Sequence, residues 1–446
     1  MTEQSTSALL LKRIAAYQWA VLDKPHLTYS DISPLLRELA VRERITLTRI
    51  GNSFQGLPIH RLTIGNGPLT FLAWTQMHGD EPTATAAMLD LLAMLSEPAC
   101  DDIICDNWLS QVTLHIIVML NPDGASLTRR ENAQGIDINR DARALQTPEG
   151  RLLDEQVREL RPDIGFNLHD QSRYYAVGSS KKPATLSFLA PPFNAAGDVD
   201  GSRLRAKQLI AAMHQAVSNH RPGQFGRYND AYAHRCFGDT IAGCGVSTIL
   251  IESGADYHDP NRQSARTLNV VALYTALNAS ISQRYLQYSL DDYYAIAENQ
   301  ENGLCDVLLK NVTQENETGD RYRCDIAVNE TAPGHATVVA TGDLTELGGF
   351  REIDCDGLTL CNAKGFCAEP GDSVTGTAYL GLLSQGYNHL LCQNSRINIA
   401  TDLPLLQCLS PLPERTGPLP GTPAFFVFRD DKKPCCALLS THWLTF

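Results

Sequence analysis

A histidine and a glutamate three positions apart stand between a predicted strand and a predicted helix. His78 and Glu81 follow the apolar, β-favouring run 69–75 and precede the run 82–95, in which a proline opens a helix-favouring stretch. Such a turn can direct an imidazole and a carboxylate at one divalent ion, and zinc accepts both kinds of donor. Because this spacing is common by chance, the pair gains meaning only if further ligands follow downstream.

Two more residues of this kind end predicted strands. His169 ends the strand at 163–169 and Glu252 ends the strand at 246–252. The carboxyl ends of parallel strands meet at one edge of a sheet, so these side chains are expected to converge. Two histidines and one carboxylate form the ligand set of an open zinc site, where the metal lowers the pKa of a water to about 7. A further carboxylate suits the general base, and a charge ending an apolar strand such as that of Glu252 needs a reason.

An arginine-bearing loop supplies the cationic groups. The segment 130–140 begins with Arg130 and ends with Arg140. A guanidinium fork meets two needs of amide hydrolysis, because it holds a substrate carboxylate in two-point contact and it stabilises an oxyanion. The residues alone do not say which arginine serves which need.

Taken in order, these pieces resemble the zinc carboxypeptidase family of funnelin metallopeptidases (carboxypeptidase A-like, M14), in a poorly characterised bacterial branch. The resemblance covers roughly residues 70–255 and nothing after 300. It rests on five segments: His78-Gly-Asp-Glu81, Asn121-Pro-Asp-Gly124, Arg130 with Gly135-Ile-Asp-Ile-Asn-Arg140, Asn167-Leu-His169, and Ile249-Leu-Ile-Glu-Ser-Gly254.

The resemblance implies a role for each matching residue. His78, Glu81 and His169 correspond to the ligands of one Zn²⁺ ion, and Glu252 corresponds to the general base. Arg130 corresponds to the arginine that stabilises the oxyanion.

The resemblance also implies how a substrate is held. Asn139 and Arg140 correspond to the pair that binds the terminal carboxylate of a peptide. The family has a mobile tyrosine that closes over the substrate, and both Tyr228 and Tyr232 are candidates for it. We favour Tyr228.

The hypothesis is therefore a zinc-dependent carboxypeptidase acting on a peptide, or a peptide-like molecule, with a free carboxylate. One alternative is a zinc amidase or deacylase acting on cell-wall peptides or N-acyl amino acids, because related folds use the same ligands. A second is a non-catalytic peptide-binding module that keeps the pocket. Neither the preferred terminal residue, its stereochemistry nor the oligomeric state follows from these motifs.

Three acidic residues near these motifs have plainer interpretations. Asp123 is expected to be a turn residue, and Asp137 to organise its loop rather than touch substrate. Asp170 is either a carboxylate that orients an imidazole or an exposed loop acid.

The elements that must position these residues alternate between strand and helix over the first 300 residues. This pattern predicts an α/β fold with a mixed, largely parallel twisted sheet and helices on both faces. After about residue 300 the runs become short, β-favouring and interrupted by turn residues, and nine of the thirteen cysteines occur there. We predict a catalytic domain over 1–297 and a smaller β-rich accessory domain over 298–446.

The composition of the 446 residues limits the partners. The net charge is −13, which argues against nucleic acid and anionic membrane surfaces. We find no run of 18 apolar residues that would predict a transmembrane helix, and no secretory signal. With an odd number of cysteines, reduced thiols and a cytoplasmic location are expected.

Overall fold

The computed structural model describes residues 3–98, 107–316, 318–369, 371–392, 397–412 and 417–446. The chain divides into two compact units, Met1–Glu301 and Asn302–Phe446. Each unit is described by itself below. None of the described helices is both long enough and apolar enough to span a membrane.

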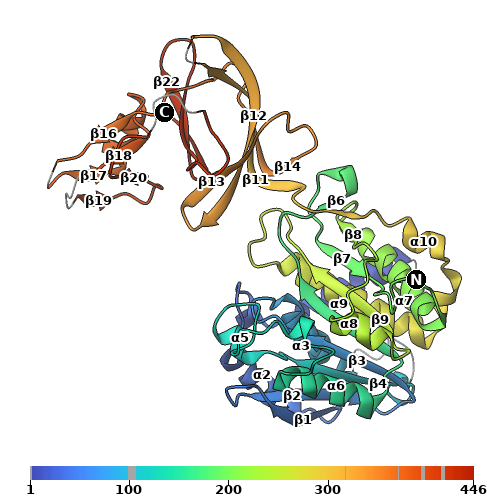
Figure 1. Cartoon of the computed structure of the whole chain (residues 1–446). Coiled ribbons are helices and arrows are strands. Elements are labelled where there is room, and N and C mark those ends of the chain that lie inside the picture. Colours follow the sequence, from blue (N-terminus) through green and yellow to red (C-terminus); the bar gives the residue numbers. More distant parts are fainter. Residues whose placement is uncertain (1–2, 99–106, 317, 370, 393–396, 413–416) are drawn as a thin grey trace. The chain divides into compact units, whose positions relative to one another are not determined.

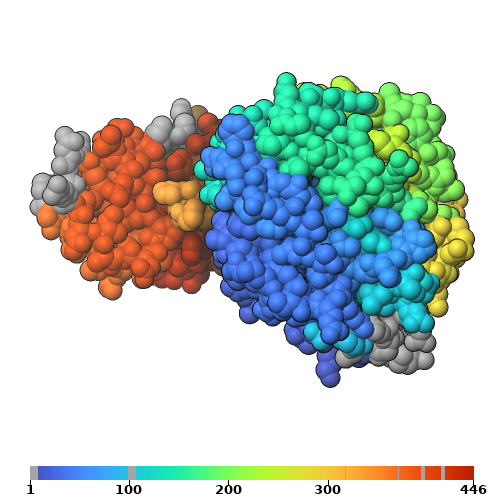
Figure 2. Space-filling view, turned by 90° about the horizontal axis from the view of Figure 1, so that it is seen from below, coloured from blue at the N-terminus to red at the C-terminus, as the bar shows by residue number. Residues whose placement is uncertain are grey.

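The first unit is organised around an eight-stranded mixed sheet (Figure 1). Across the sheet lie β1 (Ile45–Asn52), β2 (Pro58–Gly65), β4 (Val112–Val118), β3 (Leu69–Thr75), β5 (Ile164–Asp170), β9 (Ser247–Ser253), β7 (Leu186–Leu189) and β8 (Phe225–Arg227). The four central strands β4, β3, β5 and β9 run parallel, so their carboxyl ends share one edge. The antiparallel β1–β2 hairpin closes one side, and the N-terminal part of the chain, in blue, forms much of one face of this unit (Figure 2).

Helices cover both faces of this sheet. One apolar core lies between the sheet and the helices α1 (Glu3–Tyr17), α2 (Tyr29–Ala40), α3 (Thr83–Leu95), α7 (Gly201–Ser218) and α9 (Gln263–Ile281). A second, smaller core lies on the opposite face, under α6 (Pro148–Leu160) and α8 (Phe237–Ala242). The short helices among the described residues of the unit are η1 (Ala20–Leu22), η3 (Trp108–Ser110), α5 (Pro122–Ser126), η4 (Ile138–Arg140), η5 (Gly178–Ser180), η6 (Arg284–Gln287) and α10 (Leu290–Tyr294). The predicted α/β class is confirmed.

The central strands are buried because they carry apolar residues on both faces. In β3, Phe71 and Ala73 enter the first core while Leu72 and Trp74 enter the second. Strands covered on both sides read as nearly continuous apolar runs, which is why the sequence predicts them well. Helix α3 is likewise buried along its whole length.

Left-handed backbone marks the points where two central strands leave the sheet. Gln76 follows β3 with φ 49° and Met119 follows β4 with φ 57°. The Gln76 amide donates to the carbonyl oxygens of Leu27 and Gly79, both at 2.9 Å, and so fixes the loop that leads to α3. A Cβ at Gly79 would lie 2.0 Å from the carbonyl carbon of Gly124, so only glycine fits there.

The end of the first unit returns to the sheet. Strand β10 (Asn299–Gln300) pairs antiparallel with β6 (Ala176–Val177). The Arg227 guanidinium holds the same segment, through a hydrogen bond to the carbonyl of Ile296 at 3.0 Å and an ion pair with Glu298 at 2.7 Å.

The second unit is rich in β-structure, as predicted. Its main sheet contains β11 (Leu304–Glu315), β12 (Arg321–Ala332), β13 (His335–Gly342), β14 (Gly348–Asp354), β15 (Thr359–Leu360), β21 (Phe425–Arg429), β22 (Pro434–Leu439) and β23 (His442–Thr445). Two small sheets, of β16 (Gly365–Cys367), β18 (His389–Leu391) and β20 (Gln407–Cys408) and of β17 (Ser373–Thr375) and β19 (Asn398–Ala400), accompany helix α11 (Gly376–Leu383). The described cysteines are free thiols, and Cys100 and Cys105 lie outside the described residues.

Candidate active site

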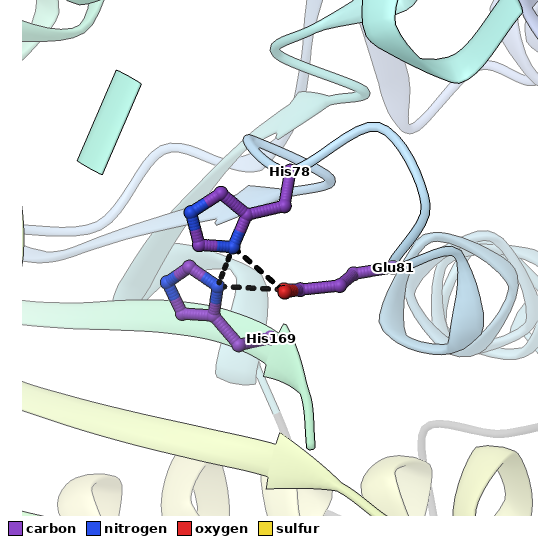
Figure 3. Close-up of side chains that lie close together, drawn as sticks. All are labelled: His78, Glu81 and His169. Atoms are coloured by element: carbon purple, nitrogen blue, oxygen red, sulfur yellow. Dashed lines mark hydrogen bonds and ion pairs between the residues drawn. The ribbon is translucent and has the colours of Figure 1, made fainter. Parts of the chain in front are cut away.

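Three side chains meet at the carboxyl ends of β3 and β5 (Figure 3). His78 Nδ1 lies 2.7 Å from Glu81 Oε1, and His169 Nδ1 lies 2.8 Å from Glu81 Oε2. The two Nδ1 atoms are 3.1 Å apart. Across the described ranges, this is the one group of three or more histidine, cysteine or acidic residues whose ligand atoms lie within 4.8 Å of one another.

The arrangement fits a zinc ion. Ligands about 2.0–2.2 Å from a tetrahedral metal are roughly 3.3–3.6 Å from one another. The three donor atoms lie 2.7–3.1 Å apart, so a small outward shift of the side chains would accommodate the ion. Both histidines are only 2% exposed, and Glu81 is 9% exposed. Burial raises the pKa of the Glu81 carboxyl, yet the two imidazoles outweigh it and hold that pKa well below its usual range. The carboxylate is therefore kept in the ionised form that a metal requires.

Asp137 supports this group from the side. One carboxylate oxygen lies 3.1 Å from His78 Nε2 and accepts the backbone N–H of Asn139 at 2.8 Å. The other oxygen accepts Arg130 Nε at 2.9 Å. Although burial opposes it, these partners hold the pKa of Asp137 well below its usual range. Asp137 thus organises its loop, as predicted, and in addition contacts a candidate ligand.

Arg130 reaches the same group from the solvent side. Its Nη1 atom lies 3.4 Å from Glu81 Oε1, and its side chain remains 39% exposed. The guanidinium is thereby held beside the three donor atoms while part of it stays free to meet a bound molecule.

Glu252 lies next to His169, because the two residues are register partners on β9 and β5. Its Oε2 atom is buried and has no hydrogen-bond partner in the described part of the chain. Burial, followed by the Glu81 and Asp170 carboxylates, raises the pKa of Glu252 well above its usual range. A carboxyl group with raised proton affinity and an unused oxygen is suited to accept and release a proton.

Asp170, expected either to orient an imidazole or to be an exposed loop acid, has a buried side chain that binds other groups. Its side chain accepts Thr83 Oγ1 at 2.7 Å and lies 3.6 Å from Arg262 Nη1. Its backbone N–H donates to Glu81 Oε2 at 3.1 Å. Asp170 therefore fixes the start of α3, and it orients the glutamate rather than a histidine.

Asn139 and Arg140 lie on η4, beside the second histidine. Asn139 Nδ2 is 3.4 Å from His169 Nε2, and its Oδ1 accepts the backbone N–H of Phe237 at 3.0 Å. Arg140 is exposed, and one Nη1 atom contacts Cys236 Sγ at 3.1 Å.

Tyr228 is held by a network of amides. Its hydroxyl donates to Gln171 Oε1 at 2.9 Å, and Asn299 Nδ2 donates to the same oxygen at 3.1 Å. Burial and the Glu252 carboxylate raise the pKa of Tyr228, so the hydroxyl stays protonated. Tyr232 instead lies against His234, with ring centroids 6.4 Å apart.

The structure thus brings together every predicted metal-site residue, Glu252 and Arg130, and it places Asn139 beside them. The contacts of Asp137 and Asn299 were not predicted. The contact of Asp137 could have been predicted, because this acid lies in the same short loop as Arg130 and Asn139. Asn299 gave none, because it lies 128 residues from Gln171.

The part of the chain that carries His78 and Glu81 is similar to a known family. Residues 33–161 match the family model described as zinc carboxypeptidase (M14 peptidase). The resemblance predicted from the motifs is therefore confirmed.

Individual similar proteins share low sequence identity with this chain. Carboxypeptidase SOL1 of Arabidopsis thaliana is 28% identical over 166 residues, which are 33% of this chain and 34% of that protein. The match therefore spans about a third of that relative. Similar solved structures include a metallo-carboxypeptidase from Burkholderia cenocepacia (15% identity, 56% of this chain and 69% of that one, TM-score 0.43). Another is a metallo-carboxypeptidase from Pseudomonas aeruginosa in complex with (2-guanidinoethylmercapto)succinic acid (19%, 57% and 69%, TM-score 0.47).

Proposed function

We propose that this protein is a zinc-dependent carboxypeptidase that hydrolyses the C-terminal peptide bond of peptides. The observation that carries the proposal is the convergence of His78, Glu81 and His169 on one point. On the neighbouring strand, the buried Oε2 atom of Glu252 has no hydrogen-bond partner among the described residues. A metal ligand set next to an independent proton acceptor is what amide hydrolysis by water requires.

His78, Glu81 and His169 would hold one zinc ion. Bound there, zinc polarises a carbonyl and lowers the pKa of a water to about 7. The buried position of the two imidazoles, and the hydrogen bond between Asp137 and His78 Nε2, keep the donor atoms aimed at the metal.

Glu252 takes the proton from the attacking water and passes it to the leaving amine. Its raised pKa favours a carboxyl that can hold this proton between the two transfers. Arg130 stabilises the negative charge that develops on the carbonyl oxygen, because its guanidinium is fixed by Asp137 and remains partly exposed toward the site.

Asn139 and Arg140 bind the free carboxylate of the peptide, which confines cleavage to the chain end. Asn139 lies against His169 and Arg140 follows it on η4, so the terminal carboxylate is held one residue from the scissile bond. Tyr228 covers the substrate from the Gln171 side and offers a protonated hydroxyl.

Hydrolysis of N-blocked dipeptides before and after chelation tests this proposal. We expect activity to be lost on chelation, restored by zinc, and confined to peptides with a free rather than amidated C-terminus. Equal cleavage of the amidated peptide would contradict the roles of Asn139 and Arg140. Faster turnover of N-acyl amino acids or cell-wall peptides would indicate an amidase or deacylase. A zinc-loaded protein that cleaves none of these substrates would indicate a binding module.

A further inference from the structure

We propose that the terminal residue this protein removes carries a second carboxylate in its side chain, and that Arg143 and Arg235 bind it. The proposal rests on the proposed carboxypeptidase function, in which Asn139 and Arg140 hold the main-chain carboxylate. Its observation is a cluster of three exposed arginines, Arg140, Arg143 and Arg235, on two segments that lie side by side.

The two segments, 139–143 and 234–237, lie antiparallel to each other and lead away from the metal ligands. Next to His169, Asn139 Oδ1 accepts the backbone N–H of Phe237 at 3.0 Å. One step further, Arg235 Nε donates to the carbonyl oxygen of Arg140 at 3.1 Å.

The same pairing continues to the end of the cluster. Arg143 Nε donates to the carbonyl oxygen of His234 at 3.1 Å, and the backbone N–H of Ala142 donates to the carbonyl oxygen of Arg235 at 3.3 Å. If Asn139 and Arg140 bind the terminal residue of a peptide, the guanidiniums of Arg143 and Arg235 lie on the side of that residue away from the metal ligands.

The hydrogen bonds of these three guanidiniums differ from those of other arginines in the unit. Within the described residues none of them forms an ion pair, and their hydrogen bonds go to carbonyl oxygens and to the Cys236 thiol. Among the described residues of the same unit, seven other arginines lie within 3.1 Å of a carboxylate, namely Arg42, Arg130, Arg158, Arg203, Arg221, Arg227 and Arg266.

The acids of the two segments are already engaged. Asp137 binds His78 and Arg130, and Asp141 accepts hydrogen bonds from Thr147. Asp239 is buried and accepts the backbone N–H of Ala233. Three neighbouring cations repel one another, and because the acids beside them bind other groups, an anionic ligand would offset this repulsion.

Two carboxylates on one terminal residue match this arrangement. The main-chain carboxylate meets Asn139 and Arg140, and the side-chain carboxylate meets the forks of Arg143 and Arg235, which suit planar two-point contact. A neutral amide of the same shape offers one acceptor where a carboxylate offers two. A hydrogen bond to a charged group contributes about 1.5–3 kcal/mol, so glutamate should be preferred over glutamine by about 10- to 100-fold.

The test compares the zinc-loaded protein on N-blocked dipeptides ending in Glu, Gln, Leu and Lys. We expect the Glu-ended peptide to have the highest kcat/KM, and its advantage over the Gln-ended peptide to shrink as salt is raised. Arg235→Gln and Arg143→Gln should each bring the Glu/Gln ratio toward one. Arg235→Glu should move preference toward the Lys-ended peptide. Arg151→Gln is the matched control, because this exposed arginine of α6 contacts only the carbonyls of Leu145 and Gln146.

Binding provides a readout that does not depend on turnover. Calorimetry with Glu252→Gln protein should give tighter binding of the intact Glu-ended peptide than of the Gln-ended peptide. If no peptide is cleaved but this difference holds, the proposed reaction fails and the carboxylate site stands. The inference would be overturned if the Leu- or Lys-ended peptide had the highest kcat/KM, or if neither substitution changed the Glu/Gln ratio of kcat/KM. It would also be overturned if only a Glu at the penultimate position raised kcat/KM.

Discussion

Asp137 bridges His78 and Arg130, with one carboxylate oxygen 3.1 Å from His78 Nε2 and the other 2.9 Å from Arg130 Nε. A single side chain therefore sets the orientation of a proposed metal ligand and of the proposed oxyanion-binding arginine. The two functions of the site are coupled through this carboxylate.

Replacing Asp137 with alanine should weaken zinc binding by about 10- to 100-fold, the usual effect of losing a carboxylate that orients a ligand histidine. Competition between the protein and a coloured chelator measures this affinity. Asp154→Ala removes a carboxylate of α6 that is paired with Arg158 and should leave the affinity unchanged. Unaltered zinc binding in Asp137→Ala would show that the hydrogen bond to His78 does not orient the ligand.

Glu252→Gln should retain one zinc ion per chain and lose at least ~10²-fold in kcat, because glutamine cannot accept the proton of the attacking water. Metal analysis and steady-state kinetics on the same preparation separate the two effects. Normal turnover with full metal content would remove Glu252 from the role of general base.

Arg130→Ala should lower kcat by about 10²–10³-fold if its guanidinium stabilises the oxyanion. The neighbouring Arg129 is the control, since its guanidinium donates to the Asn132 carbonyl and not to the Glu81 group. If Arg129→Ala lowered kcat more than Arg130→Ala, the oxyanion-stabilising role would belong to Arg129.

The stability of the first unit should fall as the pH drops from 6.5 toward 4, in part through His115. Burial, followed by the charge of Arg61, lowers the pKa of His115 from 6.5 to about 4. Below pH 6.5 the unfolded chain therefore binds a proton that the folded chain refuses, which favours unfolding. In His115→Gln the thermal midpoint should fall less over this range, whereas in His258→Asn, at an exposed position, it should follow the parent protein.

Sequence patterns predicted the elements that are long or buried on both faces. The runs at 69–75, 112–120, 163–169 and 246–252 correspond to β3, β4, β5 and β9, and their carboxyl ends carry the site. The pattern missed β7, β8 and α8, which have four, three and six residues and are too short to show a period.

The roles that sequence reasoning did not predict are those that depend on a third partner. Asp170 follows His169 directly, yet the backbone turns its carboxylate to Thr83 and its N–H to Glu81. The contact of Asn299 with Gln171 joins distant parts of the chain through polar side chains, and neither periodicity nor spacing encodes such a contact.

The hydrogen bond between Asn299 and Gln171 sets where this chain can be shortened. A protein ended after residue 297 would lack β10 and the amide that shares the Tyr228 acceptor, so an altered KM would report damage to the substrate cover. Ending the chain at Glu301 keeps both, so that any remaining change in the use of long substrates belongs to the second unit.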